Sequence, residues 1–116
     1  MDINLDRVLG RLEELYQCGA QDDGTFTRMA YSPEDRKGRE IFMDYFRKLG
    51  IEPKMDAAGN LIARLEGEDK TLPAIMTGSP LDTVTVGGRY DRALGCVTCL
   101  EGCQTPVASR RKLRHS

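Results

Sequence analysis

The sequence has little of what several protein classes require. It contains a single histidine, His115, and no tryptophan, so a metal site built from several histidines of this chain is excluded. No apolar run approaches the roughly 20 residues of a membrane-spanning helix, and the charged N-terminal region lacks the apolar stretch of a signal peptide. The net charge of −1 gives no general attraction to nucleic acid or acidic lipid. We therefore expect a cytoplasmic protein with neither a nucleic-acid partner nor a membrane partner.

Cysteine is present but sparse, at Cys18, Cys96, Cys99 and Cys103. In a reducing compartment these residues are expected to be free thiols rather than a disulfide framework. The last three recur at i, i+3 and i+7, and together with His115 they would make four zinc ligands. A continuous helix would separate the first and last of them by about 10 Å along its axis, so such a site requires a break near Gly102. Buried thiols are the interpretation that we favour.

The first half of the chain predicts two amphipathic helices. Residues 3–17 carry apolar side chains at helical spacing, and Asp2 or Asn4 can cap the start. The second helix follows Ser32, an N-cap residue that precedes a proline and two acids at the positive end of the helix dipole. It ends at Gly50, because glycine accepts a left-handed backbone.

The middle of the chain predicts strands. Residues 51–56 and 61–65 flank a turn and are expected to pair as a hairpin. The continuous apolar run at 73–77 is typical of a buried strand in a mixed sheet. A third helix is expected from about Arg92 onward. This order of helices and strands predicts an α/β sandwich.

The pattern changes near the end of the chain. A length of 116 residues suits one small domain, or a piece of a larger one, with little margin for a core. We expect residues 1–101 to form that unit. Residues 102–116 are basic and lack apolar periodicity, so we expect a disordered tail. The alternative is a tail that binds nucleic acid or a partner, although no aromatic residue lies there to stack on a base.

The segment most suited to chemistry is the stretch from residue 77 to residue 91. It leaves the end of the expected buried strand, where α/β proteins build their sites. Asp82 and Asp91 lie on either side of Gly87-Gly88, so the loop can fold back and bring both acids toward one point. A carboxylate can bridge two metal ions that activate water for hydrolysis. Aspartates in glycine-rich loops are also common turn formers, and the residues alone leave both interpretations open.

Several motifs follow one another in order over residues 3–101. They are Gly-Thr-Phe-Thr-Arg at 24–28, Asp-Ala-Ala-Gly-Asn-Leu at 56–61, Gly-Ser-Pro-Leu-Asp-Thr-Val at 78–84, Gly-Gly at 87–88 and Asp-Arg-Ala-Leu-Gly at 91–95. Together they resemble the zinc-dependent amidohydrolases of the N-carbamoyl-L-amino acid hydrolase and allantoate amidohydrolase type, in the clan of di-zinc exopeptidases and aminoacylases. Motifs that match in series are far more specific than any one of them.

The resemblance implies an α/β fold, namely a partial N-terminal portion of a di-zinc exopeptidase-like sandwich with a mixed sheet. It implies zinc or manganese as cofactor, with Asp91 as the bridging metal ligand and Asp82 as the catalytic acid that orients a neighbouring ligand. Two departures matter. The family's first metal-binding histidine corresponds to Pro80, which has no side-chain donor. The glycine after the bridging aspartate corresponds to Arg92, whose charge disfavours a nearby dication and whose side chain is expected to strain the loop.

The family also continues well beyond this chain, with a Glu-Glu pair, further histidines and a domain that contacts substrate and the second subunit of a homodimer. We therefore expect a truncated homologue of a hydrolase that acts on linear C–N bonds of small carbamoyl or ureido acids. As this chain, it is expected to be inactive, to hold no metal stably and to lack the dimerisation domain. A reading-frame shift after codon 101 is our hypothesis for the change in pattern. The alternatives are a non-enzymatic partner-binding fragment and one half of a split hydrolase.

Overall fold

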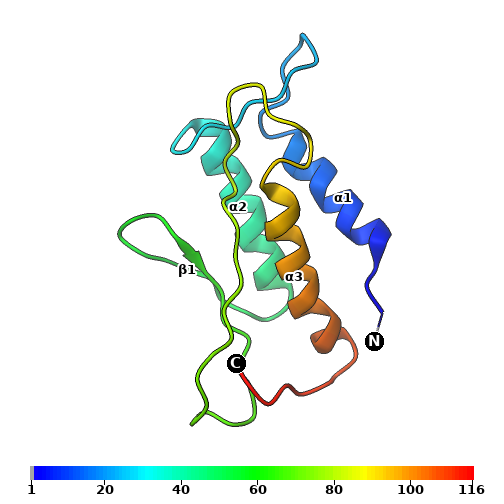
Figure 1. Cartoon of the computed structure of the whole chain (residues 1–116), viewed down its shortest axis with the longest axis vertical. Helices are drawn as coiled ribbons and strands as arrows, with labels where there is room; N and C mark the ends of the chain where they lie inside the picture. Colours follow the sequence, from blue (N-terminus) through cyan, green and yellow to red (C-terminus); the bar gives the residue numbers. More distant parts are fainter. Residues whose placement is uncertain (1) are drawn as a thin grey trace.

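The computed structural model of the chain describes residues 2–116. In chain order its elements are α1 (Leu5–Tyr16), α2 (Pro33–Lys48), β1 (Lys54–Met55), β2 (Leu61–Ile62) and α3 (Ala93–Ala108). Figure 1 shows the three helices gathered together, with the hairpin to one side and a long extended segment that returns past them toward α3. None of the helices within residues 2–116 is long and apolar enough to cross a membrane.

The caps that the sequence predicted are the ones that start the first two helices. Asn4 Oδ1 accepts a hydrogen bond from the Arg7 amide at 2.9 Å, and Ser32 Oγ accepts one from the Asp35 amide at 3.1 Å. These bonds satisfy backbone donors that have no partner inside a helix. Gly50, just beyond the end of α2, has a φ of 78°, which favours glycine. Both helix predictions are confirmed.

One apolar core joins all three helices, and α1 packs against both α2 and α3. The core residues that come from the helices are Val8, Leu12, Leu15, Phe42, Tyr45, Phe46, Ala93, Cys96, Val97 and Leu100. Each large apolar side chain removed from water contributes about 1.5–3 kcal/mol. Two further residues, Ile51 and Leu81, bring the end of α2 and the segment before α3 into the same core.

The hairpin is confirmed, but its strands are shorter than expected. Lys54 pairs with Ile62 and Met55 with Leu61 in an antiparallel register. The turn is built by Asp56, whose Oδ1 accepts hydrogen bonds from two backbone amides of the following residues at 3.0 and 2.8 Å. The α/β class is therefore confirmed as a helical unit that carries a two-stranded sheet.

The buried strand expected at 73–77 is wrong. This segment is extended but belongs to no sheet, and the side chains of Ile75 and Met76 are 73% and 92% exposed. An apolar run becomes a buried strand only where a neighbouring strand and a covering layer meet it, and neither lies beside it within residues 2–116. Instead, the Ile75 amide donates to the Ser116 carbonyl at 3.0 Å.

The end of the chain does not separate from the rest at residue 101. Helix α3 runs through residue 102 and continues to Ala108. The final residues then lie against the segment near residue 68, where the Glu68 amide donates to the Leu113 carbonyl at 2.8 Å and the Asp69 amide to the Arg114 carbonyl at 3.1 Å. Figure 1 shows the C-terminus beside this extended segment. The predicted boundary at residue 101 therefore falls inside α3, and the residues after Ala108 lie along the segment near residue 68.

Candidate functional site

The candidate loop, residues 78–91, is held against the end of α1 by a buried arginine. Arg28 is fully buried, and its Nε and Nη2 donate to the Leu81 carbonyl at 3.0 and 2.8 Å. Its Nη1 donates to the Leu15 and Cys18 carbonyls at 2.5 and 3.2 Å. Burial lowers the pKa of this guanidinium, but arginine remains charged in proteins. Arg28 therefore ties the start of the loop to the C-terminal end of α1.

The backbone before Arg28 also runs along the loop. The Thr83 amide donates to the Arg28 carbonyl at 2.8 Å, and the Arg28 amide donates to Thr83 Oγ1 at 2.8 Å. Farther along, the Gly87 amide donates to the Phe26 carbonyl at 2.8 Å. The sequence motif at residues 24–28 indicates the family resemblance but not this positioning role. The motif gave the residue types, but no local signal could show that the arginine is buried.

The other edge of the loop packs against the first turns of α3. Ser79 Oγ donates to the Arg92 carbonyl at 2.9 Å, and Cys96 Sγ donates to the Ser79 carbonyl at 3.0 Å. A Cβ added at Gly95 would lie 2.6 Å from the Ser79 Cβ, so this contact requires glycine. Burial raises the pKa of the Cys96 thiol to about 11, and the group therefore stays protonated at neutral pH.

The two candidate acids lie on either side of Gly87-Gly88 and have different surroundings. Asp82 Oδ2 accepts a hydrogen bond from Arg92 Nη1 at 3.0 Å, and the side chains are 21% and 37% exposed. Asp91 is half-buried, and a Cβ added at Gly87 would lie 3.0 Å from Asp91 Oδ2. The first glycine of the pair therefore leaves room for the Asp91 carboxylate, whereas the carboxylate of Asp82 is compensated by an arginine of the same chain.

The donor set does not fit a di-metal centre. A structural or catalytic zinc needs about four ligands, counting water, but residues 2–116 contain no group of three or more His, Cys, Asp or Glu side chains that could hold a metal. Pro80 is exposed and offers no side-chain donor, and Arg92 adds a positive charge beside Asp82. No chemical step through a metal ion can be derived from these residues.

The cysteine alternative fares no better. Helix α3 is continuous through Gly102, where a zinc site would need a break. The Cys99 thiol lies 3.1 Å from Thr77 Oγ1, and His115 Nδ1 lies 3.0 Å from the Pro73 carbonyl. The cysteines of α3 are free thiols, of which Cys96 is buried and the other two are partly buried.

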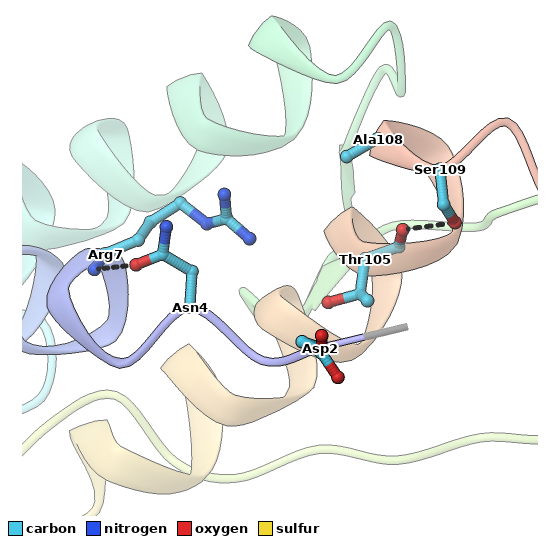
Figure 2. Close-up of a pocket in the computed structure, with 6 residues that line it drawn as sticks. All are labelled: Asp2, Asn4, Arg7, Thr105, Ala108 and Ser109. Atoms are coloured by element: carbon cyan, nitrogen blue, oxygen red, sulfur yellow. Dashed lines mark hydrogen bonds between the residues drawn. The ribbon is translucent and has the colours of Figure 1, made fainter.

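A shallow hollow lies elsewhere, between the start of α1 and the end of α3 (Figure 2). It has a volume of about 300 Å³ and is lined by Asp2, Asn4, Arg7, Thr105, Ala108 and Ser109. Several of its polar groups already serve helix ends, since Asn4 caps α1 and Ser109 Oγ donates to the Thr105 carbonyl at 2.9 Å. It includes no residue of the 78–91 loop and does not extend the candidate site.

Comparison with known proteins shows which proteins share this sequence and fold. No family model matches the chain. The chain is 38% identical over 100 residues to the N-carbamoyl-L-amino acid amidohydrolase of Geobacillus stearothermophilus. This alignment covers 86% of this chain and 24% of the relative. It is 36% identical over 89 residues to the allantoate amidohydrolase of Bacillus subtilis, covering 77% of this chain and 22% of the relative. A solved hydantoinase/carbamoylase family amidase from Burkholderia ambifaria superposes with a TM-score of 0.93 at 32% identity, over 98% of this chain and 28% of that one.

The chain matches one segment of the hydantoinase/carbamoylase family of amidases. It spans about a quarter of the length of the relatives that it matches. The resemblance predicted from the sequence motifs is confirmed, and so is the α/β character of this portion of the amidase fold. The carbamoylase-like region therefore keeps its backbone arrangement even though Pro80 and Arg92 depart from the family pattern.

Proposed function

We propose that this chain is an amidase-family segment that does not hydrolyse C–N bonds by itself. Its relatives are named as amidohydrolases of N-carbamoyl-L-amino acids and of allantoate, which makes linear C–N bonds the substrate class of the family. The observation that carries the proposal is the 3.0 Å ion pair between Arg92 and Asp82. It places a fixed positive charge in the loop that the family resemblance associates with metal ions.

Under this proposal, the two acids keep the positions that the family gives them but lack the partners that their roles need. Asp91 corresponds to the bridging ligand for zinc or manganese, and Asp82 to the acid that orients a neighbouring ligand. Pro80 supplies no imidazole for Asp82 to orient. Two carboxylates without further donors bind a transition metal weakly, because a site gains affinity and geometry from its full ligand set.

An activity assay on the purified chain tests the proposal. The substrates are N-carbamoyl-L-amino acids, allantoate and ureidoglycolate, each supplied with zinc or manganese. We expect no product above a protein-free blank. The matched control is Asp91→Asn, because a trace of contaminating amidase would not respond to it. Metal-dependent product formation that disappears in Asp91→Asn contradicts the proposal.

A split hydrolase is the second candidate, and one observation favours it. Ile75 and Met76 are exposed in an extended apolar segment, and the chain spans about a quarter of the length of its relatives. A second polypeptide that carries the remaining part of the fold could pair with this segment and complete an α/β sandwich with a mixed sheet. Coexpression with the corresponding remainder of a relative distinguishes the cases. Copurification with activity indicates a split enzyme, and copurification without activity indicates a partner-binding fragment. If the two chains do not copurify, both alternatives are contradicted.

A further inference from the structure

The backbone of Arg92 has an unusual conformation. Its φ is 57° and its ψ is −41°, a combination that side chains other than glycine rarely adopt. Residues held in such regions cost about 1–3 kcal/mol and persist only where surrounding contacts compensate. The contacts here are specific, since the Arg92 carbonyl accepts from Ser79 Oγ at 2.9 Å and from the Gly95 amide at 3.0 Å. The strained backbone therefore holds the Arg92 side chain at a fixed place beside the loop.

The side chain of Arg92, directly after the 78–91 loop, reaches back to a residue within that loop. Its Nη1 lies 3.0 Å from Asp82 Oδ2, a residue ten positions earlier in the chain. The charge of Asp82 also acts on the buried Arg28, where it opposes the lowering of the arginine's pKa by burial. Arg28, however, directs its hydrogen bonds to backbone carbonyls, as at Leu81. Arg92 is therefore the cation that hydrogen-bonds to the Asp82 carboxylate within the described residues.

We propose that Arg92 is a built-in counter-cation, which orders the 78–91 loop without a metal ion and keeps divalent cations away from Asp82. The proposal rests on the proposed function. It gives a structural reason why these residues do not fit a metal centre. A dication approaching Asp82 must either displace the guanidinium or remain beside it, and like charges at such distances repel. Arg92 is a positioning residue in this scheme and takes no part in chemistry.

Three substitutions separate charge from backbone strain. Arg92→Gln removes the charge but keeps a long polar side chain, Arg92→Lys keeps the charge, and Arg92→Gly removes both the charge and the cost of a positive φ. The matched control is Arg89→Gln, which removes a neighbouring cation of the same loop. Arg89 pairs with Glu13 and its guanidinium lies 4.2 Å from the centre of the Tyr16 ring, so it does not compensate Asp82.

Hydrogen exchange measured by mass spectrometry provides the readout. The peptide that spans residues 82–91 reports the loop, because its Thr83 and Gly87 amides are hydrogen-bonded to residues 26–28. The peptide from α2 reports whether each variant is folded. Each protein is measured with a chelator and then with excess zinc.

We expect Arg92→Gln to exchange about fivefold faster in the loop than the wild-type chain when the chelator is present, which corresponds to a partly exposed ion pair of about 1 kcal/mol. Zinc should slow this exchange in Arg92→Gln and Arg92→Gly, but not in the wild-type chain, Arg92→Lys or Arg89→Gln. If Arg92→Gly loses α2 protection, Arg92→Gln alone decides. Unchanged loop exchange in Arg92→Gln, or the same zinc response in Arg92→Gln and the wild-type chain, overturns the inference. Metal-dependent amidase activity would refute the proposed function and leave these exchange results as a separate measurement.

Discussion

Replacing Glu101 with glutamine should weaken the polar contact between α1 and α3. The Glu101 side chain is 1% exposed and lies in the middle of α3. Its Oε1 accepts from the Asn4 amide at 2.9 Å and from Arg7 Nη2 at 2.5 Å, and its Oε2 accepts from Arg7 Nε at 2.8 Å. Arg11 Nη1 adds a cation 3.6 Å from Oε2. One carboxylate thus holds the first two turns of α1.

The expected loss of stability follows from how much of this cluster can return to water. Removing one partner of a buried ion pair costs about 3–5 kcal/mol. Arg7 is 28% exposed and Arg11 is 12% exposed, so both regain part of their hydration, and glutamine retains one acceptor. We therefore expect the lower end, about 3 kcal/mol. A domain is stable by only about 5–15 kcal/mol, so this loss is a large fraction of the total. It should lower the melting temperature by about 10 °C.

The pH dependence provides an independent check on the same carboxylate. Hydrogen bonds from Arg7 hold the pKa of Glu101 below its ordinary value of 4.5, with a smaller contribution from the Asn4 amide. The folded state therefore binds this proton less readily than the unfolded chain does. The stabilisation is fully present above pH 4.5 and is lost as the pH falls through the lower folded pKa. The difference in the free energy of unfolding between the wild-type chain and Glu101→Gln should therefore narrow in that acidic range.

Urea unfolding followed by far-ultraviolet circular dichroism measures both effects. The matched control is Glu40→Gln, because Glu40 pairs with Arg36 on the surface of α2, where the side chains are 64% and 83% exposed. Such a pair contributes about 0.3–0.5 kcal/mol. Equal losses in the two variants, or a gap for Glu101→Gln that does not change with acid, would refute the reasoning.

Three further substitutions and one labelling experiment test the packing of the loop and of α3. Gly95→Ala should destabilise the chain by about 2 kcal/mol through its clash with Ser79, whereas Gly102→Ala, with open space around it, should stabilise by about 0.5–1 kcal/mol in urea unfolding. Arg28→Met should cost about 3 kcal/mol, because the carbonyls that it serves lose their buried donor, and proteolysis of the 78–91 loop should become faster. Iodoacetamide should alkylate Cys96 slowly near neutral pH and quickly after unfolding, since burial raises its thiol pKa to about 11; equal rates before and after unfolding would contradict this.

Local signals in the sequence were sufficient for the helix starts and the hairpin. Asn4 and Ser32 cap their helices through bonds that span three residues, and Asp56 builds its turn through bonds that span two and four. Such contacts depend on little beyond the adjacent residues, so composition and spacing predict them. The strain expected at Arg92 was also correct, because its φ is positive where the family motif has glycine.

Long-range contacts were not predictable in the same way. Charged residues are expected at the surface, yet Arg28 and Glu101 are buried because each meets partners far away in the sequence, up to 97 residues for Glu101. The apolar segment at 73–77 failed for the opposite reason. Its composition is typical of burial, but burial also requires a covering layer, and the Met76 side chain is 92% exposed.

The two buried charges hold opposite ends of the same helix with the signs that its dipole favours. Glu101 accepts from the Asn4 amide at the N-terminus of α1, and Arg28 donates to the Leu15 and Cys18 carbonyls at its C-terminus. Helix α1 has no basic residue in its own last turn, so the cation comes from elsewhere in the chain.

A double-mutant cycle tests whether these anchors act independently. The 12 residues of α1 separate its ends by about 18 Å, and sites this far apart usually have additive effects on stability. The buried face of α1, with Leu12 at its centre, should keep the helix docked when either end is released. The losses in Glu101→Gln and Arg28→Met should therefore add within about 0.5 kcal/mol in the double variant. A larger deviation would show that α1 moves as one body when an anchor is removed, and the two charges would then form a single coupled device.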